Sequence, residues 1–190
     1  MKTKINILIA ILLLITGSFA CGISTPKYIK GSAKDINLTL DEMKALEFAP
    51  DNLQVSADGL WKMTLFAWVG VKAENCDNLE AFSYRYFFPV YFLGFRGEGT
   101  GVTVTVYKDS DSAQKCFDKI NDAYTTTDTQ SNIFSIIENP IEGSDDSTTL
   151  LYQSNYYMVY YLKGNVIGRV QTSCDTCAVS IAEKVIENIP

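Results

Sequence analysis

The strictly alternating segment Gly101–Tyr107 (GVTVTVY) constrains the fold of this chain more than any other part of the sequence. Val102, Val104 and Val106 point to one side and the residues between them to the other, which is the period of a half-buried β-strand. Residues 96–100 (RGEGT) before it supply two glycines that tolerate positive φ. We therefore predict a hairpin that joins this strand to an aromatic-rich strand within Phe82–Phe95, bent or at a sheet edge near its proline.

A helix over residues 110–124 is predicted directly after the alternating strand. Asp109 or Ser110 is suited to cap its first turn. Its apolar residues recur at helical spacing and form a single face: Ala113, Cys116, Phe117, Ile120 and Tyr124. Since the helix follows the strand at once, we expect it to fold back and cover the valine side of that strand.

The C-terminal part has the same arrangement. Tyr157–Lys163 and Val166–Thr172 flank Gly164-Asn165, a two-residue sequence typical of a type II′ hairpin turn, and a helix is predicted over residues 175–188. This register places Val159 opposite Val170 and Tyr161 opposite Gly168 on one face. Leu162 then lies opposite Ile167, and Tyr160 opposite Arg169, on the other face.

Both parts read as strands followed by one helix, at an offset of about 64–65 residues. The match is either an internal strand-strand-helix repeat or two independent occurrences of a common arrangement. The resulting prediction is an α+β fold, an antiparallel sheet with two main helices packed on one face. A shorter helix is expected over 38–49, with Thr39 and Glu42 as a capping box. Further strands are expected over residues 60–71, 133–137 and 149–153.

The N-terminus is typical of an export signal. Lys2 and Lys4 precede a short apolar run, far below the roughly 20 residues that span a bilayer, and small residues follow. Cys21 directly after Ala20 resembles the lipobox of prokaryotic lipoproteins. That resemblance implies a cysteine carrying fatty acyl chains such as palmitate, and a membrane anchor at the cell envelope. Ser18-Phe-Ala20 also fits ordinary signal cleavage, which would give a secreted protein.

The expected organisation is a signal peptide over 1–20, a lipid-anchored tether over 21–35 and a single domain over 36–190. From Val102 onward, VTVTVYKDSDSAQKCF and YYMVYYLKGNVIGRV resemble prokaryotic exported α+β domains with no assigned activity. The resemblance implies neither a catalytic residue nor a cofactor.

Composition excludes several classes of function. The chain has no histidine, so Ser-His-Asp and Cys-His catalysis are excluded, and the commonest transition-metal ligand is missing. The formal net charge is −6, and removal of Lys2 and Lys4 with the signal peptide leaves 14 basic and 22 acidic residues. We expect no nucleic-acid partner for so acidic a domain.

Four cysteines besides Cys21 allow three disulfide pairings. We favour Cys174–Cys177 together with Cys76–Cys116, because exported proteins are usually oxidised. Alternatives are zinc binding with Cys76 and Cys116, a free core thiol at Cys116, or a redox pair at Cys174-Asp-Thr-Cys177. Asp175 raises the expected pKa of Cys174, and few residues follow the motif to build a redox fold, so we predict a stable bridge without turnover.

The aromatic strand offers the best candidate for ligand binding. Tyr84, Tyr86, Phe88 and Tyr91 form either ordinary core packing or an aromatic-lined groove for an apolar or sugar ligand. A calcium site or a pair of catalytic carboxylates in the acidic loop 139–148 is a weaker hypothesis. The leading prediction is a non-enzymatic envelope domain that binds a protein or small ligand. Its rivals are a thiol-disulfide redox protein and a purely structural envelope component.

Overall fold

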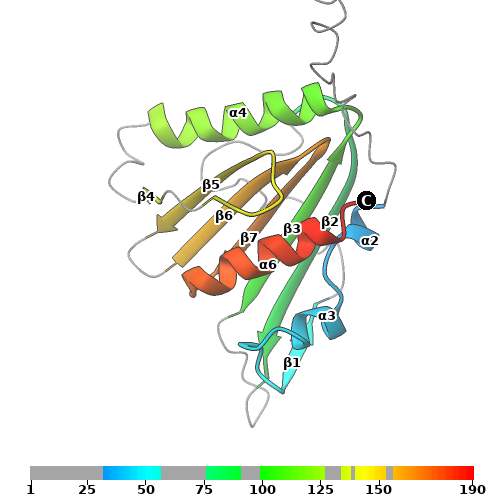
Figure 1. Cartoon of the computed structure of the whole chain (residues 1–190), viewed down its shortest axis with the longest axis vertical. Helices are drawn as coiled ribbons and strands as arrows, with labels where there is room; N and C mark the ends of the chain where they lie inside the picture. Colours follow the sequence, from blue (N-terminus) through cyan, green and yellow to red (C-terminus); the bar gives the residue numbers. More distant parts are fainter. Residues whose placement is uncertain (1–31, 57–75, 91–98, 127–133, 138–139, 153–155) are drawn as a thin grey trace, which may run out of the picture.

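The computed structural model describes residues 32–56, 76–90, 99–126, 134–137, 140–152 and 156–190 (Figure 1). Cys21, Tyr91 and the strand expected over 60–71 lie outside these residues. The described chain contains one antiparallel sheet of seven strands in the order β1-β2-β3-β7-β6-β5-β4. The strands are β1 (Leu53–Val55), β2 (Leu79–Pro89), β3 (Thr100–Tyr107), β4 (Phe134–Ile137), β5 (Asp146–Tyr152), β6 (Tyr156–Lys163) and β7 (Val166–Thr172). The predicted α+β class and antiparallel sheet are confirmed.

The centre of the sheet is the pair β3–β7, which joins segments far apart in the sequence. Val102 lies opposite Val170, and Val106 lies opposite Val166. The hairpin β6–β7 has the predicted register throughout, including Tyr161 opposite Gly168. Gly164 has a φ of +57°, as the first central position of a type II′ turn requires.

Within the described residues, four helices accompany the sheet: α2 (Ala33–Ile36), α3 (Leu40–Lys44), α4 (Ser110–Thr126) and α6 (Asp175–Glu187). The amide of Ser112 donates to Asp109 Oδ1 at 2.7 Å, which confirms Asp109 as a cap of α4. The capping box of Thr39 and Glu42 is also present, although α3 is shorter than the helix expected there. Ala33, which lies in the segment 21–35 predicted as a tether, is only 1% exposed and packs in the core.

The helices cover both faces of the sheet, which differs from the prediction of one covered face. The first core contains the valine side of β3 with helix α6 and the short helices α2 and α3. The second core contains the α4 residues Cys116, Phe117 and Ile120 against Tyr160 and Leu162. Figure 1 shows α6 across the front of the sheet and α4 along its upper end. The valine side is therefore covered by α6, and α4 packs on the opposite side.

This difference has a plain physical reason. Strand β6 carries apolar residues on both sides: Val159 and Tyr161 belong to the first core, and Met158, Tyr160 and Leu162 belong to the second. Each face needs its own cover, and α6 already occupies the first. The two strand-strand-helix units are consequently not equivalent in space, which argues against a structural repeat.

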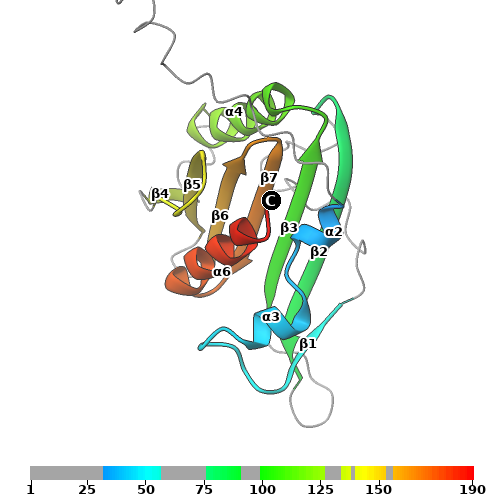
Figure 2. The same ribbon diagram turned by 45° about the vertical axis from the view of Figure 1, so that its right-hand side comes forward.

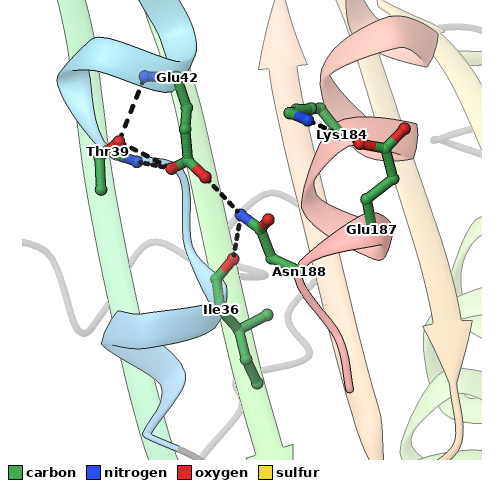
Figure 3. A network of polar contacts seen from close by, with 6 residues as sticks. All are labelled: Ile36, Thr39, Glu42, Lys184, Glu187 and Asn188. Atoms are coloured by element: carbon green, nitrogen blue, oxygen red, sulfur yellow. Dashed lines mark hydrogen bonds and ion pairs between the residues drawn. The ribbon is translucent and has the colours of Figure 1, made fainter.

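The first and last elements of the described chain lie side by side (Figures 1 and 2). Asn188 Nδ2 donates to Ile36 O at 3.4 Å and to Glu42 Oε1 at 3.1 Å (Figure 3). The guanidinium of Arg85 on β2 donates to Asn37 O at 2.8 Å and to Leu38 O at 2.6 Å. These bonds fasten α2 and α3 over β2 and next to the end of α6.

Candidate functional site

Two places in the described chain bring functional groups together, and the first is a face of the sheet. Alternation along β2 directs Tyr84 and Tyr86 to the face opposite the valine side of β3. Register across the sheet places Arg169 and Gln171 of β7 on the same face, near the end that α4 does not cover. Together with Tyr156 of β6 they form what we call the tyrosine face: Tyr84, Tyr86, Tyr156, Arg169 and Gln171.

The floor of the tyrosine face is lined by small residues of β3. Thr103 lies between Tyr84 and Arg169, and Gly101 lies between Tyr86 and Gln171. A Cβ on Gly101 would stand 3.2 Å from the hydroxyl of Tyr84, so the tyrosine ring leans over the bare backbone of the glycine. A Cβ at position 101 would therefore require the hydroxyl end of Tyr84 to shift by a few tenths of an ångström.

The phenol of Tyr84 has a shifted pKa. Burial raises the pKa of Tyr84, and the nearby hydroxyls of Tyr86 and Tyr156 raise it further, whereas the charge of Arg169 lowers it. Neighbouring strands lie about 4.8 Å apart, so β2 and β6, with β3 and β7 between them, are separated by roughly 14 Å. The register sets Tyr84 level with Tyr160 of β6, and Tyr156 lies four residues away along that strand. Tyr84 and Tyr156 therefore share one face of the sheet at different levels.

Burial differs among the groups of this face. Tyr84, Tyr86 and Tyr156 keep partial exposure, whereas Arg169 is only 3% exposed and donates to Gln171 Oε1. Phe88 is 6% exposed, and its ring lies 5.9 Å from that of Tyr86 at an interplanar angle of 25°. Among the four aromatic residues predicted for ligand binding, Tyr84 and Tyr86 are thus accessible, while Phe88 serves as packing beneath Tyr86.

The sequence did not single out Tyr156, Arg169 or Gln171 as site residues. A signal for Arg169 was present, because an arginine within the apolar strand VIGRV is unusual for a buried position. No comparable signal marked Tyr156, since its place on the same face as Tyr84 depends on the strand order.

The second place is the C-terminal cysteine pair. The structure pairs Cys174 with Cys177 and Cys76 with Cys116, as favoured from the sequence. The zinc and free-thiol alternatives for Cys116 are therefore wrong. Cys116 and Cys76 are 1% and 5% exposed, whereas both sulfurs of the other bridge belong to partly exposed residues. Cys174 and Cys177 also line a small pocket beside the first core.

The acidic loop 139–148 has structural partners. Asp145 accepts from the amide of Gly164 at 2.6 Å, and Asp146 accepts from the amide of Ser147 at 2.7 Å. Asp145 also lies 3.8 Å from the ammonium group of Lys163. Among the residues that the structure describes, no group of three or more cysteine or carboxylate side chains is arranged to hold a metal ion.

Comparisons with known proteins show the fold alone. No protein-family profile and no curated protein matches the sequence. The fold is similar to that of the extracellular domain of PknH from Mycobacterium tuberculosis, with a TM-score of 0.54 and 12% identity. The match covers 83% of this chain and 94% of that domain. The two disulfides fit an exported protein.

None of the helices in the described ranges has the length and apolar character needed to cross a membrane.

Proposed function

We propose that this chain is a non-enzymatic domain of the cell envelope whose tyrosine face binds a small ligand of sugar-like chemistry. The observation that carries the proposal is that Tyr84, Tyr86 and Tyr156 lie on the same face of the sheet as Arg169. These groups come from three different strands, so the face is assembled only in the folded sheet.

The chemistry of these side chains suits a ring with one apolar face and polar edges. A tyrosine ring packs against apolar surface, while its hydroxyl donates or accepts a hydrogen bond. Gln171 adds a partly exposed amide group to the same face, and the nearly buried guanidinium of Arg169 holds this amide by donating to its oxygen. A few polar groups within an aromatic lining are the usual composition of a small-molecule site.

Binding can be tested with soluble oligomers of N-acetylglucosamine and isothermal titration calorimetry. Tyr156→Phe removes one hydroxyl from the tyrosine face and should weaken binding roughly twofold to tenfold, the worth of one hydrogen bond. Tyr157→Phe is the matched control, because the adjacent residue packs against the core on the opposite face. Equal affinities of the two variants would place the ligand elsewhere. Binding to envelope proteins but not to saccharides would favour the protein-ligand alternative.

We further propose that a lipid on Cys21 holds the domain at the membrane. Ser32, the first described residue, follows Cys21 by only about ten residues, enough for a chain reaching roughly 35 Å when extended. Cys21→Ser should move the protein from the detergent phase to the aqueous phase in a partitioning experiment. Unchanged membrane association of the Cys21→Ser protein would contradict anchoring through this residue.

A further inference from the structure

A pocket of about 180 Å³ lies on the side of the sheet opposite the tyrosine face. Its walls are the corner between α3 and β1, the end of β2, and the start of α6. The apolar wall residues are Met43, Phe48, Leu53 and Phe87, and the opposing wall contains Cys174 and Cys177. We call this the disulfide pocket.

The size of the disulfide pocket limits what it can hold. Sites for drug-sized molecules are about 300–1,000 Å³, whereas a cavity of roughly 150 Å³ lined by apolar side chains accepts benzene. At about 180 Å³ the disulfide pocket has room for one apolar side chain, such as a phenylalanine ring.

The reactivity of the Cys174–Cys177 disulfide limits which kind of molecule can carry this side chain and react. A disulfide exchanges with thiolates, so a reactive occupant must bear a thiol. Cys174 is the N-cap residue of α6, and the amide of Cys177 donates to Cys174 Sγ at 3.3 Å. That hydrogen bond and the helix dipole stabilise negative charge on Cys174, which makes it the better leaving group.

We propose that the disulfide pocket seats an apolar side chain of a polypeptide with two nearby cysteines, and that the Cys174–Cys177 bridge oxidises this cysteine pair. A small thiol such as glutathione has no apolar side chain to fill the pocket. This single exchange, without turnover, is independent of ligand binding at the tyrosine face and goes beyond it.

The exchange is a balanced two-electron step. One thiolate of the polypeptide attacks Cys177 Sγ, the bridge breaks, and Cys174 leaves as a thiolate. The second thiolate then attacks the polypeptide sulfur of the mixed disulfide and releases the thiolate of Cys177. The polypeptide gains one disulfide, and the two protein thiolates take up from water the protons that its thiols released.

The sequence predicted no exchange, because Asp175 is expected to raise the pKa of Cys174 and few residues follow the motif to build a redox fold. In the structure, a position for a substrate is supplied by the disulfide pocket, which is built from residues 43–53 and Phe87, distant in sequence from the cysteine pair. These pocket residues and the cysteine pair are brought together only in the folded protein.

The test uses the full chain in its oxidised form and two synthetic dithiol peptides. Each peptide has cysteines at both ends, and its central residue is phenylalanine in one and serine in the other. Acid quenching, alkylation and mass spectrometry follow the opening of each bridge. The phenylalanine peptide should open Cys174–Cys177 at least tenfold faster than the serine peptide. The buried Cys76–Cys116 bridge is an internal control and should stay closed.

Phe48→Ala alters the wall of the disulfide pocket and leaves the disulfide in place. It therefore tests the contribution of the pocket apart from the reactivity of the bridge. Phe48 is 41% exposed at the pocket wall, so its loss should leave the melting temperature nearly unchanged. This variant should lose the preference for the phenylalanine peptide while its reaction with reduced glutathione keeps the original rate. Equal rates for the two peptides, a preference that survives in Phe48→Ala, or faster opening by glutathione than by either peptide would each overturn the proposal.

Discussion

The buried hydroxyl groups of Tyr107 and Tyr161 differ in their hydrogen bonding. The hydroxyl of Tyr107 donates to Cys116 Sγ at 3.2 Å, whereas that of Tyr161 has no hydrogen-bond partner among the described residues. Burial raises the pKa of both phenols well above the ordinary value. Tyr161 is nevertheless required by shape, because its ring fills the space over Gly168, where a Cβ would stand 1.8 Å from the ring.

Removing each hydroxyl should therefore change stability in opposite directions. Tyr161→Phe removes an unsatisfied buried group and should raise the free energy of unfolding by about 1 kcal/mol. Tyr107→Phe removes a satisfied group and should lower it by roughly 0.5–1.5 kcal/mol. Urea denaturation of both variants measures the difference. A loss of stability in Tyr161→Phe would mean that its hydroxyl has a partner.

Gly168 itself gives a second test of this packing. Gly168→Ala should destabilise the protein by about 3 kcal/mol or more, because the fully buried ring of Tyr161 has nowhere to move. Gly101→Ala is the matched control on β3, where the nearest atom is the hydroxyl end of the partly exposed Tyr84 at 3.2 Å. Thermal denaturation of the two variants compares them. Similar losses would show that the space over Gly168 can relax.

Helix α4 shows how an element can be predicted well and placed wrongly. Its cap at Asp109 and its apolar face through Phe117 followed from local sequence. Its side of the sheet did not, because that depends on which face the other helices already cover. A sign of two covered faces was nevertheless present in YYMVYYL, where apolar residues occupy both sides of one strand.

The packing of α4 can be measured directly. Phe117 is fully buried, and Phe117→Ala should cost about 3–5 kcal/mol of unfolding free energy. Lys119→Ala is the matched control, because its side chain is exposed on the same helix, and it should change stability by less than about 0.5 kcal/mol. A cost below about 1 kcal/mol for Phe117→Ala would contradict the second core.

The capping box of α3 makes stability depend on pH. The hydrogen bond from the Thr39 amide is the main cause of a lowered pKa at Glu42, with the Thr39 hydroxyl and Asn188 contributing (Figure 3). A carboxylate with a lowered pKa stabilises the fold above its unfolded pKa, about 4.3, and loses this contribution as the pH falls through its folded value.

Glu42→Gln should therefore lower the melting temperature at pH 7. The difference from the unmodified protein should shrink as the pH falls from about 5 towards 3, because the carboxyl group then becomes protonated. Glu47→Gln, at an exposed position nearby, is the control and should show little difference at either pH. A pH-independent difference would point to packing rather than charge at position 42.

The candidate sites depend on the whole molecule, which is why only part of them could be predicted from the sequence. The alternation of β2 was enough to place Tyr84 and Tyr86 on one face. The presence of Tyr156 on the same face depends on the pairing of β3 with β7, between segments about 65 residues apart. The disulfide pocket likewise joins residues 43–53 to Cys174 and Cys177, and no local pattern connects those segments.

The two disulfides should contribute unequally to global stability. Cys76–Cys116 spans 40 residues and Cys174–Cys177 spans 3, so chain entropy predicts a loss of about 4 kcal/mol for the first and about 2 kcal/mol for the second. Paired Cys→Ala substitutions and guanidinium denaturation give both values. Equal losses, or a larger loss for the shorter loop, would show that strain or packing outweighs chain entropy here.

The hydrogen bonds from Asn188 to Ile36 and Glu42 also bear on when α2 and α3 can dock during synthesis (Figure 3). A ribosome delivers α2 and α3 well before β7 and residue 188. The sheet surface under α2 includes β3, and the central pairing of β3 needs β7. The docking site of α2 and α3 is thus unfinished until β7 and residue 188 have been synthesised. In a chain exported during synthesis, α2 and α3 would reach the membrane before the surface on which they pack exists.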